Sequence, residues 1–233
     1  MRGCLSVLIL GAGFVLAAAW FAGPTLAGAL VERSLDGAGF VAAQRSVTVA
    51  ADPPLEILAG HADRVTITAT RARVRDLSAA SVGLVLTNVD LVGGTFAGVD
   101  GQLDDVLIPT VDGSSVEARS VTVRGRAAAA TAVVRIDSSI IEALLGKAIR
   151  RQTGLSVSAV TLSAPDRIRF TAGLTISGRF AVDADGSLVI AATSGDTRFT
   201  VFRPNPDLRL TSAAVSGNQL VLTGTTDLST LIR

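Results

Sequence analysis

The chain has 233 residues, of which 48% are apolar and 18% charged, so it carries enough apolar surface to fold around a core and is not an intrinsically disordered chain. Its 21 basic and 20 acidic residues give a net charge of +1, without the basic excess that is typical of nucleic-acid binders. Eight Phe, one Trp and no Tyr supply few stacking platforms for bases. We therefore expect no nucleic-acid partner.

The first predicted element is an uncharged segment at the start of the chain. No residue between Gly3 and Val31 is charged, and an apolar run of about 20 residues is long enough to cross a bilayer as a helix. We interpret residues 1–23 as a transmembrane anchor, with residues 24–233 on the extracytoplasmic side. A cleaved signal peptide is the alternative, because the small residues at 17–19 or the TLA at 25–27 suit a peptidase.

A short helix is predicted next, over Pro24 to Asp36, with Leu26, Leu30 and Leu35 near one face. The segment SVTVA at residues 46–50 then alternates like a strand, and DPP at residues 52–54 interrupts it.

The segment DRVTITA, residues 63–69, predicts a strand with one apolar face, because Val65, Ile67 and Ala69 alternate with polar residues. After Thr70 the alternation inverts, and Arg71, Arg73 and Arg75 take the positions of the apolar set. A bulge or a strong twist near Thr70 would reconcile the two halves.

Further strands are predicted at 81–91, and then in two or three segments between residues 106 and 136. We interpret the intervening GGTFAGVDGQLDD, residues 93–105, as a glycine-rich connection. After residue 154, alternating segments separated by turn residues predict strands to the end of the chain.

The clearest predicted helix runs from Ser138 to Gly154. Ser139 and Glu142 are spaced as a capping box, and Gly154 suits the C-terminal cap. Its apolar residues recur at helical spacing and form a wide stripe: Ile140, Ile141, Leu144, Leu145, Ala148 and Ile149.

A second copy of the D-R strand follows this helix, as DRIRFTA at residues 166–172. Each copy comes after a helix and an alternating strand. This order suggests an internal duplication with halves at 24–136 and 137–233, although an Asp-Arg pair at the start of a strand also needs no duplication.

Three segments carry a resemblance to a known family: PPLEILAGHADRVTITA at residues 53–69, LVLTNVDL at 84–91 and DSSIIEALL at 137–145. Together with the apolar N-terminal segment, their order resembles that of the LmeA-like family of bacterial envelope proteins. The resemblance implies phospholipid binding, and phospholipase activity in at least one branch. It also implies a tubular α+β fold, mostly β, in which a long antiparallel sheet wraps around a helix and leaves an apolar groove. A phospholipid and the membrane are therefore the expected partners.

In such a fold we expect the helical stripe and the first helix to line the acyl-chain site, and three arginines to meet lipid phosphates. The predicted lining residues are Ile140, Ile141, Leu144, Leu145, Ile149, Leu26 and Leu30, and the predicted headgroup residues are Arg71, Arg73 and Arg75. The plainer alternatives are a filled core and a solvated strand face.

The sequence offers little catalytic chemistry. His61 is the only histidine and the only candidate base for a phospholipase or esterase, and no G-x-S-x-G motif accompanies it. One cysteine, Cys4, and one histidine leave only carboxylates as metal ligands, and Asp104-Asp105 and Asp183 with Asp185 are more typical of turns. We expect no metal and no cofactor. The alternatives to a lipid-binding protein are a hydrolase and an envelope scaffold with a filled core.

Overall fold

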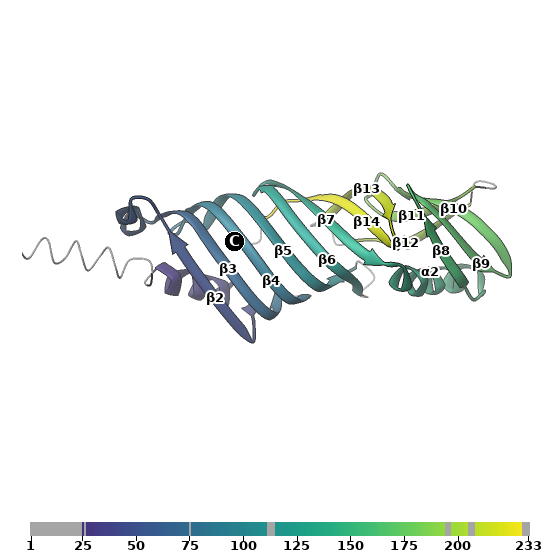
Figure 1. The fold of residues 1–233 in the computed structure, drawn as a ribbon, viewed down its shortest axis with the longest axis horizontal. Helices are drawn as coiled ribbons and strands as arrows, with labels where there is room; N and C mark the ends of the chain where they lie inside the picture. Colours follow the sequence, from purple (N-terminus) through teal and green to yellow (C-terminus); the bar gives the residue numbers. More distant parts are fainter. Residues whose placement is uncertain are drawn as a thin grey trace, which may run out of the picture.

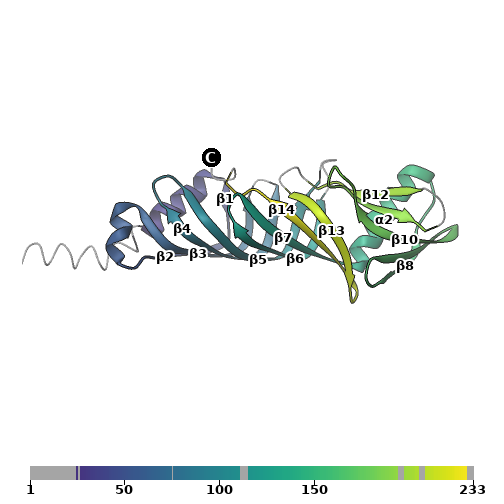
Figure 2. The same ribbon diagram turned by 90° about the horizontal axis from the view of Figure 1, so that it is seen from above.

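The computed structural model describes residues 25–229, apart from 26, 75, 111–114, 194–196 and 205–207, and apart from the side chain at 152. These residues form two antiparallel sheets and few helices, so the predicted mostly β fold is confirmed. Figures 1 and 2 show an elongated molecule, with the larger sheet along most of its length and the smaller sheet at one end.

The larger sheet has nine strands in the order β1-β3-β4-β5-β6-β7-β14-β13, and β2 also pairs with β3. Its two edges do not pair with each other in the described part of the chain, so the sheet is open. The strands are β1 (Phe40–Val41), β2 (Gln44–Ala50), β3 (His61–Val74), β4 (Leu77–Asp90), β5 (Thr95–Pro109), β6 (Ser115–Arg126), β7 (Ala129–Asp137), β13 (Leu208–Ser216) and β14 (Gln219–Thr226). A 3-10 helix, η1 (Pro54–Ala59), joins β2 to β3.

The smaller sheet has five strands in the order β12-β11-β10-β9-β8. The sequence predicted one long sheet, but α2 (Ser138–Thr153) follows β7 directly and carries the chain away from that edge, so the next five strands pair with one another. These strands are β8 (Ser158–Ser163), β9 (Arg167–Ala172), β10 (Leu174–Val182), β11 (Leu188–Ala192) and β12 (Arg198–Phe202).

The inverted alternation after Thr70 is confirmed. Val65, Ile67 and Ala69 are buried, and beyond them Ala72 is buried instead of Arg71. Arg71 has a left-handed φ of 49°, which turns the pleat over without shifting the register to β4. On β5, Asp105 has a φ of 48° at the corresponding step, so the break continues across neighbouring strands and bends the sheet.

The prediction of a glycine-rich connection at 93–105 is wrong, because most of this segment belongs to β5. Glycine and aspartate have low strand propensity. Strands β4 and β6 nevertheless pair with this segment on both sides, and their backbone hydrogen bonds keep it extended. Gly101 is buried beneath Leu84, and a Cβ added there would lie 2.3 Å from Leu84 Cδ2. The glycine therefore makes room for a leucine on the next strand.

Helix α2 ends as predicted but begins differently. Gly154 caps its C-terminus in a left-handed conformation, with φ of 75°. The predicted capping box at Ser139 and Glu142 is wrong, because Asp137 takes the N-cap position and makes no side-chain capping bond. The Asp137 carboxylate instead accepts a hydrogen bond from Gln219 at 2.8 Å and lies 3.6 Å from Arg119.

The two D-R segments occupy matching places. Each lies in the second strand of an antiparallel hairpin that follows a helix, β2-β3 in one case and β8-β9 in the other. Val65, Ile67 and Ala69 are buried in the first segment, and Ile168, Phe170 and Ala172 at the same three places in the second. The final strands β13 and β14 return to the larger sheet, and the duplication itself stays a prediction.

No helix within the described residues is both long and apolar enough to cross a bilayer. The predicted anchor, residues 1–23, lies outside the described residues, so the anchor also stays a prediction.

Candidate functional site

One face of the larger sheet, here called the inner face, is apolar across the whole width of the sheet. Residues that pair across antiparallel strands share a face, so the register defines a continuous row of side chains. This row contains no charged residue and runs in order through Val47, Ile67, Leu84, Gly101, Val123, Ala132, Gly224 and Leu210.

A helix over residues 27–37 covers one end of the inner face. Ala27 is 2% exposed and shares a core cluster with inner-face residues Val65 and Ile67, and the helical residues Val31 and Leu35 pack against the same cluster. Figures 1 and 2 show this helix, in purple, lying against the sheet beside β2 and β3. The predicted short helix is therefore present, but it packs through Ala27, Val31 and Leu35, whereas Leu30 of the predicted apolar face is 56% exposed.

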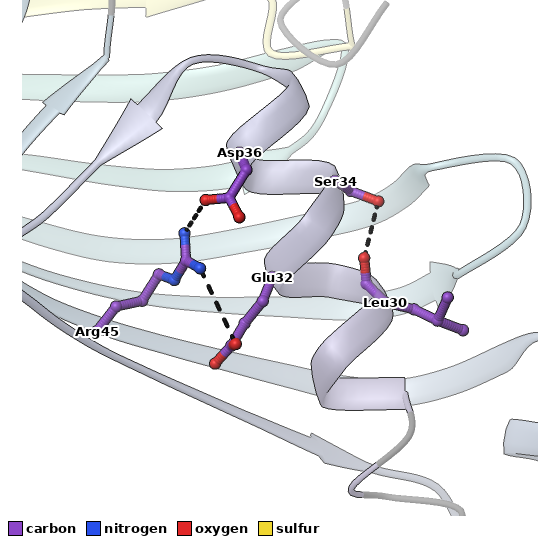
Figure 3. Close-up of polar contacts among 5 residues, drawn as sticks. All are labelled: Leu30, Glu32, Ser34, Asp36 and Arg45. Atoms are coloured by element: carbon purple, nitrogen blue, oxygen red, sulfur yellow. Dashed lines mark hydrogen bonds and ion pairs between the residues drawn. The ribbon is translucent and has the colours of Figure 1, made fainter.

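Ion pairs from one arginine hold this helix to the edge of the sheet. Arg45 on β2 donates from Nη1 to Asp36 Oδ1 at 2.6 Å, and its Nη2 lies 3.9 Å from Glu32 Oε2 (Figure 3). The hydrogen bond lowers the pKa of the Asp36 carboxyl and raises the pKa of Arg45. Ser34 on the outer side of the helix donates its hydroxyl to the Leu30 carbonyl at 3.1 Å.

Helix α2 and the smaller sheet close the other end of the molecule. Three residues of the predicted stripe, Ile141, Leu145 and Ile149, are at most 1% exposed and belong to the core cluster that contains Phe170 and Phe199. These two rings meet edge to face, with centroids 6.1 Å apart. The other three stripe residues, Ile140, Leu144 and Ala148, are only partly buried.

A middle strip of half-buried apolar side chains on β4, β5 and β6 lies at the margins of the two core clusters: Leu84, Leu86 and Phe96 pack against the cluster of the first helix, and Leu84, Leu103 and Val121 against that of α2. The cross-strand register puts them on the inner face, and they consist of Leu84, Leu86, Phe96, Leu103, Val121 and Val123. Solvent reaches this middle strip, whereas Val65 under the first helix and Val106 towards α2 are fully buried. An apolar surface that is walled at both ends can accept an apolar ligand.

The sequence carries only a partial signal for the middle strip. The alternation in SVGLVLTNVDL carries the signal, because Val82, Leu84 and Leu86 share one face of β4. Alternation predicts a buried face, but it does not say whether another element covers that face. How far the described helices extend over these strands becomes visible only in the fold.

The other predicted site residues are scattered. Leu30 is 56% exposed on the first helix, and Arg71 and Arg73 are exposed on β3. Arg73 lies on the face opposite to the buried Ala72, because side chains alternate along a strand. Leu26 and Arg75 lie outside the described residues. The headgroup role of the arginines stays a prediction.

His61 begins β3, is exposed, and lies opposite Asp90 of β4 in the register. In the part of the chain that the structure describes, His61 forms no hydrogen bond with a serine, the contact that a nucleophile and its base require. The Asp90 carboxylate accepts the backbone N–H groups of Val92 and Gly93, and these bonds lower its pKa.

The carboxylates considered as metal ligands have other partners. Asp104 accepts hydrogen bonds from Ser81 and Gln102, and the pKa of Asp104 is lowered by them. Asp183 pairs with Arg198 at 2.8 Å. Among the described residues, no group of three or more His, Cys, Asp or Glu side chains is arranged to hold a metal ion.

The chain belongs to the LmeA-like phospholipid-binding family, because the model of that family matches residues 15–225. No curated protein and no solved structure matches the chain.

Proposed function

We propose that this member of the LmeA-like phospholipid-binding family holds the acyl chains of a phospholipid on the inner face of its larger sheet. The ligand would lie along the middle strip, in an apolar groove between the helix over residues 27–37 and α2. The protein would work on the extracytoplasmic side of the cell membrane, anchored by residues 1–23, in the handling of envelope lipids.

The observation that carries this proposal is the partial exposure of the middle strip. Six large or β-branched apolar side chains on this face are only partly buried, whereas Val65, Ile67 and Val82 beside them are buried. Burial of a ligand against such a surface is favourable by about 0.8 kcal/mol for each buried CH₂ group. A lipid tail would therefore complete the core of the larger sheet.

The composition of the inner face supports an acyl chain rather than a polar ligand. The central row contains only aliphatic residues and glycine, so a ligand would meet no charged or hydrogen-bonding side chain along it. Gly101 lies beneath Leu84 and Gly224 lies against Leu208, so leucines of the neighbouring strands supply the apolar surface at these two places.

The test compares two substitutions on the same strand. Leu86→Gln places an amide in the middle strip, whereas Val85→Gln places it on the opposite, polar face, where Val85 pairs with Thr66 and Asp100. Full-length protein is purified in detergent, bound lipid is extracted, and phospholipid per protein is measured by mass spectrometry. We expect the wild type and Val85→Gln to retain phospholipid, and Leu86→Gln to lose most of it while keeping its circular dichroism spectrum.

Two results would contradict the proposal. Absence of co-purified phospholipid, together with no uptake from vesicles, would favour a scaffold with a filled core. Hydrolysis of the lipid would favour the phospholipase alternative, provided that His61→Ala lowers the rate by several orders of magnitude, as the loss of a catalytic base does.

A further inference from the structure

Three exposed apolar side chains gather at the end of the molecule that is farthest from the smaller sheet. Leu55 and Leu58 are 37% and 60% exposed, and Val92 in the turn between β4 and β5 is 86% exposed. Residues i and i+3 of a 3-10 helix eclipse each other, so Leu55 and Leu58 share one face of η1. These three residues are here called the η1 patch.

The η1 patch is built into the fold and is not a loose loop. Ile57 is 7% exposed and fixes η1 to the core, which leaves the two leucines pointing outwards. Val92 packs so closely on Gly60 that a Cβ added there would lie 2.6 Å from Val92 Cγ2. The Leu91 N–H also donates to the Gly60 carbonyl at 2.8 Å.

A carboxylate fixes the turn that carries Val92. The Asp90 Oδ1 atom accepts the N–H groups of Val92 and Gly93 at 3.0 and 2.8 Å. The turn therefore holds Val92 in a defined, solvent-exposed position next to η1. Exposure of this side chain to water adds no stability to the fold.

The patch lies where the chain enters the domain. Ala27, near the start of the first helix, belongs to the same core cluster as Ile57 of η1. Figures 1 and 2 agree, because the beginning of the purple helix and the dark blue η1 lie at the same end of the molecule. Residues 27–31, the described end of the uncharged run, therefore begin the first helix beside the patch.

The length of the connection limits how far the patch lies from a bilayer. With residues 1–23 in the membrane, residues 24–26 span at most about 11 Å, at roughly 3.6 Å per extended residue. The titratable groups that surround the patch are Asp52, Glu56, His61, Asp63, Arg64 and Asp90. Their acidic excess does not attract anionic lipids, so the attraction to a membrane would be apolar.

We propose that the η1 patch inserts into the interface of the bilayer that holds the anchor. Leu55, Leu58 and Val92 would enter the headgroup region and fix the long axis of the domain relative to the membrane. This inference deepens the proposed function, on which it rests, because a lipid taken from the bilayer would reach the inner face from this end.

The test measures the depth of a fluorescent probe in the full-length protein. Cys4 is the only cysteine, so a Cys4→Ser background permits a single labelled site. Leu58→Cys carries an environment-sensitive nitrobenzoxadiazole probe in the η1 patch, and the matched control is Leu174→Cys on β10, where the native leucine is 78% exposed. Both proteins are reconstituted in phosphatidylcholine vesicles, with and without brominated phosphatidylcholine.

We expect the probe at position 58 to show a blue-shifted emission in vesicles, and to lose most of its fluorescence to brominated lipid. The probe at position 174 should show neither change. Raising the salt concentration should leave the result at position 58 unchanged, because apolar insertion is not screened.

Equal quenching at positions 58 and 174 would overturn the inference. A blue shift at position 58 that appears without vesicles and grows with protein concentration would also overturn it, because the patch would then bind a second copy. Either result alongside co-purified phospholipid would leave the proposed function standing. If the probe at position 58 inserts but the protein binds no phospholipid, the inference stands and the proposed function fails.

Discussion

Asp36 and Arg45 show how a single pair of residues links pH to the cover of the inner face. Arg45 lowers the pKa of Asp36, so the folded state favours the charged carboxylate. The stabilisation is therefore present above the ordinary pKa of 3.8 and is lost as pH falls through the lower folded pKa. We expect Asp36→Asn to lower the melting temperature slightly at pH 7, because exposed pairs contribute little.

The measurement is a series of thermal melts of Asp36→Asn and wild type between neutral and strongly acidic pH. The difference in melting temperature should shrink towards zero below the folded pKa, where both side chains are neutral. A difference that persists unchanged in acid would show that the Arg45 bond does not cause it. Asp63→Asn is a control at an exposed carboxylate that accepts only a backbone N–H, from Asp52 at 2.7 Å.

At Arg71, the backbone conformation matters more for stability than the side chain does. A left-handed conformation costs a residue with a Cβ roughly 1–2 kcal/mol, and more for a β-branched residue. Because arginine already carries this cost, we expect Arg71→Val to lower the free energy of unfolding by the additional strain of the β-branched side chain, and Arg71→Gly to keep or raise it. Urea unfolding checks this, with Thr68→Val as an exposed control on the same strand. Equal losses for valine and glycine would mean that the arginine side chain, not φ, is responsible.

At the scale of the element, α2 has two faces with different surroundings. Leu145 is fully buried among the aromatic residues of the smaller sheet, whereas Leu144 is half exposed. An unpaired polar group in a core costs about 1–3 kcal/mol, so we expect Leu145→Gln to lower the melting temperature more than Leu144→Gln does. If the stripe also lines the lipid site, Leu144→Gln lowers phospholipid occupancy more than it lowers stability.

This comparison needs delipidated protein for the melts, because bound lipid itself raises apparent stability by mass action. Occupancy is measured separately, after reloading from vesicles. Unchanged occupancy in Leu144→Gln would assign α2 to the core alone.

The sequence predicts the positions of the strands and helices better than it predicts which of them pair or pack together. Alternation located β2, β3 and β4, and even the inversion at Arg71, because a period of two is a local property of the chain. It misassigned 93–105, where glycines lie in β5 only because β4 and β6 pair with that strand. It also misplaced the cap of α2, because β7 pairs with β14 as far as Asp137, which then takes the N-cap position while its carboxylate binds Gln219.

The candidate site shows the same division between local and distant information. The stripe on α2 was visible at helical spacing, but its burial against Phe170 and Phe199 is a tertiary fact. Leu86 looked like any other inward residue of a strand. The partial exposure of Leu86 depends on how far the helix over residues 27–37 and α2 extend over the inner face from its opposite ends. No local sequence pattern contains that information.

At the scale of the whole molecule, its parts follow one another along a single axis. The first helix begins at one end, beside the η1 patch. The middle strip follows, and α2 with the smaller sheet closes the far end. A lipid that enters from the bilayer would first meet the helix over residues 27–37, which covers this end of the inner face, and would then lie along the apolar row beyond it.

Whether the molecule is attached to a membrane at this end depends on residues 1–23, the predicted anchor. An uncharged run of this length partitions into the bilayer, so we expect the full-length protein in the membrane fraction and resistant to a carbonate wash. An arginine near the middle of a spanning helix costs roughly 3 kcal/mol, so Leu10→Arg should shift part of the protein out of the membrane, whereas Leu10→Ile should not. N-terminal sequencing of the recovered chain completes the experiment. A mature, soluble chain that begins near Gly28 would show that the segment is a cleaved signal peptide. The η1 patch would then have to hold the domain on the bilayer without an anchor.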